Sequence, residues 1–250
     1  MVVKVFILGR PGSGKSAAAR YIAALAQNYG WLPIHISDYG ILYDMFLAER
    51  ALQFTPKQKK FLPTEHGGFD VLNFAVLDDA LREVEKRIYK YMSAARNLLL
   101  IEFARNDYRK ALKHISQDLF QDTYFLFINS DMASCLQRIN KRVAYPTTPD
   151  DHFVSTKIFK RYYRKDNSTY MKSNLKRDFE IDENRIKIID NTSTLKDFHI
   201  KMWELAETIL EQESYILRET EPMPALPSLM SEAAQSKVAM SEQVSDAGNI

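Results

Sequence analysis

The sequence predicts an α/β protein in which helices flank a five-stranded parallel sheet. Five short apolar segments alternate along the 250 residues with stretches of helical periodicity, and this alternation is typical of a doubly wound sheet. Each apolar segment is followed by polar residues. In such a sheet the carboxyl ends of the strands form the edge that binds ligands, so a polar ligand-binding edge is expected here.

The first apolar segment, residues 2–8, leads directly into a glycine-rich loop. The segment is almost entirely apolar, as in a parallel strand that is buried on both faces. The loop fits the pattern G-x-x-x-x-G-K-[ST] with the residues Gly9-Arg10-Pro11-Gly12-Ser13-Gly14-Lys15-Ser16. Glycines permit backbone angles that turn successive N–H groups inward around an anion. The pattern therefore predicts a phosphate-binding loop.

The residues of this loop have separate expected roles in nucleotide binding. Lys15 would reach the β- and γ-phosphates, and the Ser16 hydroxyl would lie on a Mg²⁺ ion. The backbone from Gly9 to Ala17 would hold the phosphates. The helix that follows points its positive end at the same charge. Apolar residues at steps of three and four predict this helix, and Gly30 is expected to end it.

Four more apolar segments predict the remaining strands, and a polar residue follows each one. The segments are residues 32–36 before Ser37 and Asp38, 98–101 before Glu102, 124–128 before Asn129, and 186–189 before Asp190. Helices are expected after the fourth strand, over 131–141 with Asp131 as N-cap, and at the end of the domain, over 195–217.

Residues 1–217 are expected to form one domain with two additions to the minimal fold. Residues 39–95 would form a helical insert that contains a long amphipathic helix over 70–92. Residues 138–177 contain eleven Lys and Arg against three Asp, which indicates either a basic lid or a solvated face. Residues 218–250 are acidic and are predicted to be a disordered tail.

Composition excludes several classes of protein. The net charge of +2 is too small to argue for nucleic acid by itself. No apolar run approaches the ~20 residues that cross a bilayer, and no membrane association is expected. Cys135 is the only cysteine, so no internal disulfide exists, and a cytoplasmic location is expected. No Cys/His cluster suggests a zinc site.

With its strand ends placed, the chain resembles the P-loop kinases of the nucleoside-monophosphate-kinase type. Within them it is most similar to the branch that holds gluconate kinase, adenylylsulfate kinase and polynucleotide kinase. The resemblance covers residues 1–217, with strong motif agreement in the phosphate loop. It implies the strand order 2-3-1-4-5 and an enzyme that uses ATP and Mg²⁺. Oligomeric state is left open.

The resemblance also implies roles for residues outside the loop. Asp38 stands where these kinases place a carboxylate that contacts the acceptor hydroxyl. Arg138 and Arg142 are spaced like lid arginines. Two further stretches add candidate residues. Residues 103–112 are similar to a gluconate-kinase stretch and suggest Arg105 and Arg109 as ligands of an anionic acceptor. Residues 189–192 look like the segment that borders adenine. This second likeness implies that Asp190, Asn191 and Thr192 bind the nucleotide, and it favours ATP over GTP.

Departures from the family pattern leave the acceptor open. Ile41 stands where adenylylsulfate and polynucleotide kinases usually carry arginine. The third strand ends in Glu102 instead of an Asp-Gly pair, and Phe103 and Ala104 separate it from Arg105. No branch of the family is matched in full.

Two carboxylates compete for the role of catalytic base. Asp38 would orient or deprotonate the acceptor hydroxyl, or it would cap the following helix. Glu102 would hold Mg²⁺ through water, act as the base instead, or make a structural hydrogen bond. Arg138 and Arg142 lie one helical turn apart and would either face the same phosphates or face solvent. His66 is a further candidate for the acceptor pocket.

Three functions are compatible with these residues. The first is an ATP-dependent kinase that phosphorylates a hydroxyl or phosphate of a small metabolite or nucleotide, with residues 39–95 forming the acceptor pocket. The second is a nucleic-acid 5′-end kinase, because residues 157–177 place aromatic side chains among cations. The third is a nucleotide-gated regulatory ATPase that binds a protein partner.

Overall fold

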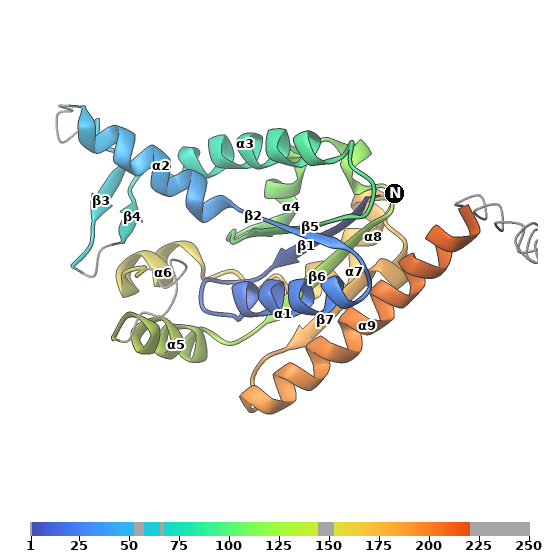
Figure 1. The fold of residues 1–250 in the computed structure, drawn as a ribbon. Helices are drawn as coiled ribbons and strands as arrows, with labels where there is room; N and C mark the ends of the chain where they lie inside the picture. The colour runs from blue at the N-terminus through green and yellow to red at the C-terminus, as the bar shows by residue number, and fades with distance from the viewer. Residues whose placement is uncertain (1, 53–57, 66–67, 145–152, 221–250) are drawn as a thin grey trace, which may run out of the picture. The chain divides into compact units, whose positions relative to one another are not determined.

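The computed structural model describes residues 2–52, 58–65, 68–144 and 153–220 (Figure 1). Two compact units divide the chain, residues 1–211 and residues 212–250. The fold and the site described below belong to the first unit. The predicted tail lies outside the described residues from residue 221 onward, and so does His66.

A five-stranded parallel sheet forms the centre of the first unit (Figure 1). Its strands are β1 (Val3–Leu8), β2 (Leu32–Ser37), β5 (Asn97–Phe103), β6 (Thr123–Asn129) and β7 (Ile186–Asp190). They lie in the order β2-β5-β1-β6-β7. When these five strands alone are counted along the chain, this is the order 2-3-1-4-5, and the predicted fold class is confirmed.

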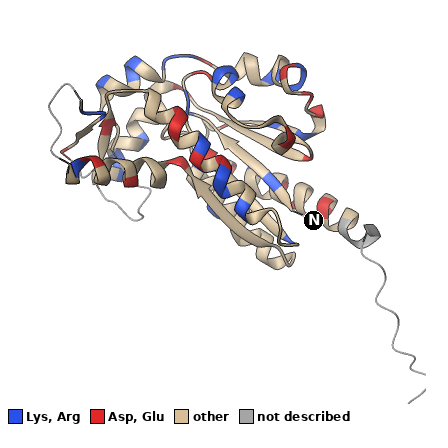
Figure 2. Cartoon of the chain, turned by 90° about the horizontal axis from the view of Figure 1, so that it is seen from above, with Lys and Arg blue, Asp and Glu red and all other residues tan. Residues whose placement is uncertain are grey.

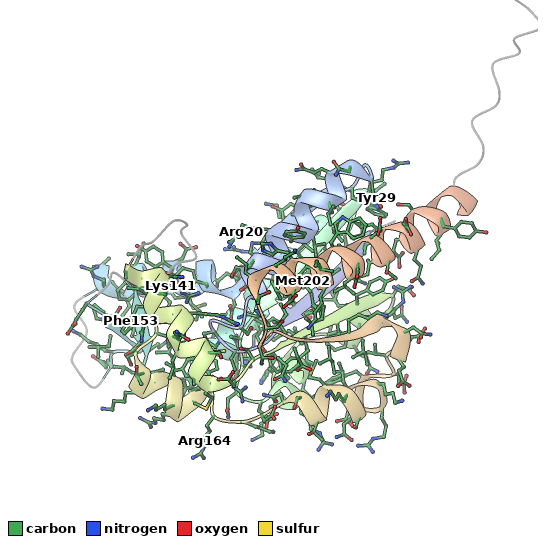
Figure 3. All side chains as sticks on the ribbon, turned by 90° about the horizontal axis from the view of Figure 1, so that it is seen from below. Arg20, Tyr29, Lys141, Phe153, Arg164 and Met202 are labelled. Atoms are coloured by element: carbon green, nitrogen blue, oxygen red, sulfur yellow. The ribbon has the colours of Figure 1, made fainter. Side chains whose placement is uncertain are left out.

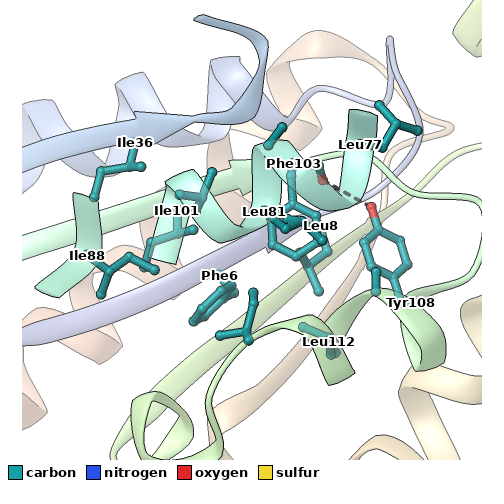
Figure 4. Packing of buried hydrophobic residues seen from close by; sticks show 14 of the residues in the cluster. Phe6, Leu8, Ile36, Leu77, Leu81, Ile88, Ile101, Phe103, Tyr108 and Leu112 are labelled. Atoms are coloured by element: carbon teal, nitrogen blue, oxygen red, sulfur yellow. Dashed lines mark hydrogen bonds between the residues drawn. The ribbon is translucent and has the colours of Figure 1, made fainter. Parts of the chain in front are cut away.

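Two apolar cores cover the two faces of this sheet. Alternate residues of β1 divide between them: Val5 packs with α1 (Lys15–Asn28) and with the first part of α9 (Leu195–Thr220), whereas Phe6 packs on the other face. That second core contains side chains of α2 (Asp38–Ala51), α3 (Ala75–Tyr91) and α4 (Tyr108–Ala111) (Figure 4). Burial on both faces explains why β1 is apolar at nearly every position.

The insert after β2 is not wholly helical, contrary to the prediction. It contains α2, then a hairpin of β3 (Phe61–Pro63) and β4 (Phe69–Val71), and then α3. The helix predicted over 70–92 therefore begins at Ala75. The apolar residues before it pair as a strand, with Phe69 buried against Phe61.

The basic stretch after β6 divides into short helices. α5 (Met132–Ala144) is followed by α6 (Thr156–Tyr162), α7 (Ser168–Ser173) and α8 (Leu175–Phe179). Met171 and Leu175 are fully buried in the core beside the sheet. The predicted lid region over 138–177 thus includes core elements at its end. Single turns of 3-10 helix at Leu112–His114, Gln117–Phe120 and Glu183–Arg185 complete the described elements.

Two local predictions, the N-cap at Asp131 and the helix end at Gly30, are confirmed. The backbone N–H of Ser134 donates to Asp131 Oδ1 at 2.8 Å, as expected of an N-cap at the start of α5. Gly30 follows α1 with a φ of 75°, a left-handed angle that favours glycine. Cys135 is buried, and its burial raises the pKa of the thiol. Within the described part of the chain, no helix combines the length and apolar character that a membrane span requires.

Charged side chains of both signs lie along the same helices (Figure 2). Arg82 and Lys86 of α3, for example, form ion pairs with Asp79 and Glu83 of the same helix. This interspersion agrees with the small net charge of +2.

Candidate functional site

A cavity of about 260 Å³ opens at the carboxyl edge of the sheet, beside the phosphate loop. The loop, the ends of β2 and β5, α5 and the insert all contribute to its wall. Most of the residues predicted to act together line this one cavity. They are Pro11, Gly12, Gly14, Lys15, Ser16, Ala17, Asp38, Glu102, Arg138 and Arg142.

The loop glycines are required by close packing as well as by backbone angle. Gly12 and Gly14 have φ values of 76° and 109°. A Cβ atom at Gly12 would lie 2.5 Å from the carbonyl oxygen of Cys135, and one at Gly14 would lie 2.7 Å from Asn191 Nδ2. Side chains are thus excluded at both positions, and the loop backbone packs directly against Cys135 and Asn191.

Lys15 and Ser16 form the charged floor of the cavity. Lys15 Nζ donates to the carbonyl oxygen of Arg10 at 3.1 Å and lies 3.8 Å from Glu102 Oε1. Burial lowers the pKa of Lys15, although the nearby carboxylates of Glu102 and Asp38 oppose this effect. Ser16 Oγ donates to Glu102 Oε1 at 2.8 Å.

Glu102 is held as a carboxylate at the end of β5. Burial acts to raise the pKa of Glu102. The hydrogen bond to His35, at 3.0 Å, and the charge of Lys15 outweigh it and hold the pKa below its usual value. Mg²⁺ is bound by one or two hard oxygen ligands together with phosphate oxygens and waters. The Ser16 hydroxyl and the Glu102 carboxylate fit that requirement, and the described residues contain no larger acidic cluster suited to a metal ion.

Asp38 does not cap the helix that it begins. Ser37 is the N-cap of α2, where its hydroxyl accepts from the backbone N–H of Tyr39 at 3.2 Å. The Asp38 carboxylate is therefore available to the cavity, and it forms a buried ion pair with the Arg105 guanidinium. Burial raises the pKa of Asp38, and Arg105 opposes the shift only in part.

Arg105 lies behind Asp38 and does not line the cavity. Besides Asp38, its guanidinium donates to the carbonyl oxygens of Leu77 at 2.5 Å and Ala104 at 2.7 Å. No helix places Arg105 and Arg109 on a common face, because α4 begins only at Tyr108.

Arg109 is an exposed residue outside the cavity. Its Nε lies 2.9 Å from Asp178 Oδ2, and more than half of its side chain is exposed. The two arginines expected to hold an anionic acceptor are thus occupied elsewhere, one supporting Asp38 and one on the surface.

Arg138 connects the loop to the end of β7. Its guanidinium donates to the carbonyl oxygen of Asn191 at 2.8 Å and to Ser130 Oγ at 3.2 Å. Arg142, one turn further along α5, also lines the cavity. Both arginines therefore line the same cavity, and the solvent-facing alternative that the spacing had left open does not apply.

Asp190, Asn191 and Thr192 do not line the cavity. Asn191 Nδ2 donates to the carbonyl oxygen of Ser13 at 2.8 Å, and Asp190 Oδ1 accepts from Asn129 Nδ2 at 2.7 Å. Asn191 thereby fixes the phosphate loop from outside. Contact of this segment with adenine stays a prediction.

Two residues have structural roles that sequence reasoning missed. The Tyr108 hydroxyl accepts from the backbone N–H of Gly9 at 2.7 Å and lies 3.1 Å from the carbonyl oxygen of Phe103. The Arg10 guanidinium donates to the carbonyl oxygens of Ser130, Tyr163 and Lys165, a role that the loop pattern, which concerns the backbone, did not assign to it. An apolar pattern cannot distinguish Tyr108 from any other core aromatic, so no local signal marked it.

The aromatic residues of the basic stretch are wholly or partly buried against other parts of the protein. Phe159 is fully buried, and Tyr162 stacks on Phe74 with ring centroids 4.2 Å apart. Burial raises the pKa of Tyr163 well above its usual value. These rings therefore do not form the open stacking surface that single-stranded nucleic acid requires. Arg164, one of the cations of this basic stretch, is exposed, lies at the edge of the molecule and points outward (Figure 3).

No protein-family model matches the chain, and no curated protein sequence matches it. Solved structures similar to it include a gluconokinase from Sinorhizobium meliloti 1021, at 13% identity and a TM-score of 0.44, covering 84% of this chain and 97% of that one. The Mycobacterium tuberculosis APS kinase CysC, in complex with AMPPNP and APS, is similar at 13% identity and a TM-score of 0.45, and the match covers 82% of this chain and 97% of that one. The structure of APE1195 is similar at 15% identity and a TM-score of 0.43, and the match covers 83% of this chain and 96% of that one.

The strand order, the glycine loop and the helix after it agree with the fold class that the sequence led us to expect.

Proposed function

We propose that this protein is an ATP-dependent phosphotransferase that phosphorylates a hydroxyl group of a small molecule. One observation carries the proposal. A single cavity brings Lys15 and Ser16 of the phosphate loop together with the buried carboxylate of Asp38. A phosphate-binding loop alone would equally suit an ATPase, whereas a carboxylate that lines the same cavity and is held in place by Arg105 suits a second substrate.

The transfer itself is a displacement at the γ-phosphorus. The acceptor oxygen forms a bond to phosphorus while the bond between phosphorus and the β,γ-bridging oxygen breaks, and ADP leaves. The proton of the acceptor hydroxyl passes to Asp38. Lys15, the loop amides, Arg138 and Arg142 supply positive charge around the moving phosphoryl group.

The contacts of the two carboxylates favour Asp38 as the base. Glu102 accepts from Ser16 and His35 and has a lowered pKa, so it is a poor proton acceptor. Asp38 has a raised pKa and is held in place by Arg105. Ser16 and Glu102 would hold Mg²⁺, which when bound neutralises charge on the phosphates.

ATP is the proposed donor, and a cytoplasmic location stays the expectation drawn from the sequence. The acceptor is a small molecule, since the insert and the segment around α6 both contribute side chains to the wall of the cavity. Asp70 Oδ1 of the hairpin accepts from the backbone N–H of Ser155 at 3.0 Å. A Cβ atom at Gly68 would lie 2.9 Å from the carbonyl oxygen of Phe153. The two segments thus meet closely at the cavity wall.

Transfer of radioactive γ-phosphate from ATP to a panel of small hydroxyl compounds tests the proposal. Wild type should label at least one compound, and Lys15→Ala and Asp38→Asn should both abolish labelling while keeping the native circular dichroism spectrum. Arg164→Ala, an exposed cation on the same chain, is the matched control and should label normally. Slow hydrolysis of ATP by wild type, with no labelled compound across the panel, would overturn the proposal.

A further inference from the structure

The structure points to a chemical class for the acceptor, an inference that rests on the proposed function. We propose that the acceptor is an uncharged alcohol that carries an apolar or aromatic ring, and that anionic metabolites are rejected. This differs from the anionic acceptor that Arg105 and Arg109 suggested at the level of sequence.

The wall of the cavity opposite the phosphate loop is apolar. It is built by α2, the β3–β4 hairpin and the start of α3, and the side chains that these elements contribute include several large apolar ones. They are Tyr39, Leu42, Phe69, Val71, Phe74 and Leu77. Apolar and aromatic walls with few polar groups are typical of sites that bind the ring of a small molecule.

The cationic side chains that line the cavity come from other elements. Among the described residues they are Lys15 and Arg20 of α1 and Arg138 and Arg142 of α5. The loop and its flanking helix bind the phosphates of the donor, so these cations lie on the donor's side. The described acceptor wall has no cation to pair with an acceptor carboxylate, sulfate or phosphate, and burying such a group without a partner is costly.

The wall also contains a carboxylate besides Asp38. Asp70 is buried at the hairpin and lines the cavity, while its Oδ1 accepts from the backbone N–H of Ser155. A carboxylate in this position accepts hydrogen bonds from O–H or N–H groups on a neutral ring and repels an anion. It therefore selects against anionic acceptors, as well as for neutral ones.

An aromatic cluster holds this wall in a fixed shape. The rings of Tyr39 and Phe69 are parallel within 2°, with centroids 5.7 Å apart. Phe69 is packed from behind by Phe46 and by Phe61, each with a centroid separation of 5.2 Å. Phe74 is fixed by its stack on Tyr162. Such pairs restrict ring motion, so the surface offered to the acceptor is preformed.

Binding measurements with matched pairs of probes test the acceptor class. Calorimetry would be done on the full chain with Mg²⁺ and saturating non-hydrolysable ATP analogue, so that the donor site is filled. The probes are thymidine against thymidine 5′-monophosphate, and 2-phenylethanol against gluconate. The neutral ring compound of each pair should bind at least about tenfold more tightly than its anionic counterpart.

Two variants test whether the apolar wall causes this preference. Phe74→Ala should weaken binding of the neutral probes about tenfold and leave the affinity for the ATP analogue unchanged. Val71→Arg places a cation on the wall and should bring thymidine 5′-monophosphate to an affinity at least equal to that of thymidine. Leu72→Ala is the matched control, because Leu72 is the exposed neighbour of Val71 and does not line the cavity.

The possible results separate the acceptor class from the proposed function. Equal or tighter binding of the anions by wild type, or no binding of either neutral probe, would overturn the acceptor class. Labelling of an anionic compound in the transfer assay would also overturn it while confirming the kinase. Tight binding of a neutral probe without phosphoryl transfer to any compound would leave the acceptor class standing and remove the kinase.

Discussion

The buried pair between Asp38 and Arg105 is expected to determine both the stability and the activity of the protein. Replacing Arg105 by methionine keeps much of the side-chain volume and removes the guanidinium. The Asp38 carboxylate then stays buried without its cation. The carbonyl oxygens of Leu77 and Ala104 lose a donor as well.

The size of the effect follows from burial. The side chains of Arg105 and Asp38 are only 2% and 10% exposed, so water cannot replace the lost partner. Breaking a buried ion pair on one side costs about 3–5 kcal/mol. For a domain of this size each 1 kcal/mol lowers the melting temperature by roughly 2–4 °C, so Arg105→Met should melt about 6–20 °C below wild type.

Chemical denaturation of a double-mutant cycle is the direct assay. Asp38→Asn combined with Arg105→Met should lose less stability than the sum of the single variants, because the double variant leaves no buried charge uncompensated. Arg109→Met is the matched control. Arg109 pairs with Asp178 at the surface with its own side chain 57% exposed, and its loss should cost about 0–1 kcal/mol.

Two results would refute this reasoning. One is a loss of stability in Arg105→Met no larger than that in Arg109→Met. The other is additivity of the two single variants in the cycle, which would mean that the carboxylate and the guanidinium do not depend on each other. If the pair holds Asp38 in place for catalysis, Arg105→Met should also lower kcat more than it raises KM for ATP.

Three further predictions concern the phosphate loop and its partners. Gly14→Ala should weaken binding of an ATP analogue at least tenfold, as measured by calorimetry, because the new Cβ would lie 2.7 Å from Asn191 Nδ2. An unchanged affinity would mean that this close contact does not shape the loop. Tyr108→Phe leaves the buried N–H of Gly9 without its acceptor and should cost about 1–3 kcal/mol in urea unfolding, whereas a neutral effect would mean that another group replaces the hydroxyl. The pKa of Glu102 is lower in the folded state than its ordinary value of 4.5, so its contribution to stability is present above that value and is lost as pH falls through the folded pKa. Wild type should therefore lose stability more steeply in acid than Glu102→Gln, and equal slopes would exclude this role.

The sequence by itself determined the sheet and the phosphate loop. Hydrophobic runs and glycine spacing are local signals, since a strand buried on both faces and a loop that excludes Cβ atoms at its glycines each restrict residues that are neighbours in the chain. The positions of Asp38 and Glu102 at strand ends followed from the same reasoning, because parallel strands end at one edge.

Other predictions depended on contacts between residues far apart in the chain. Nothing local distinguishes Arg105, which supports Asp38 from 67 residues away, from Arg109, which pairs with Asp178 on the surface. The same holds for Tyr108, whose hydroxyl meets Gly9 across 99 residues. Packing alone decided that Arg105 supports Asp38 while Arg109 lies on the surface.

The apolar character of the acceptor wall was also decided by the tertiary structure. Residues 70–92 have a helical pattern, yet Phe69–Val71 pair with Phe61–Pro63, and this pairing brings Phe69 and Val71 to the cavity. A pattern of apolar residues predicts that a side chain is buried, but it does not predict which other residues that side chain contacts. Only the folded arrangement of α2, the hairpin and α3 converts that burial into the wall of a binding site.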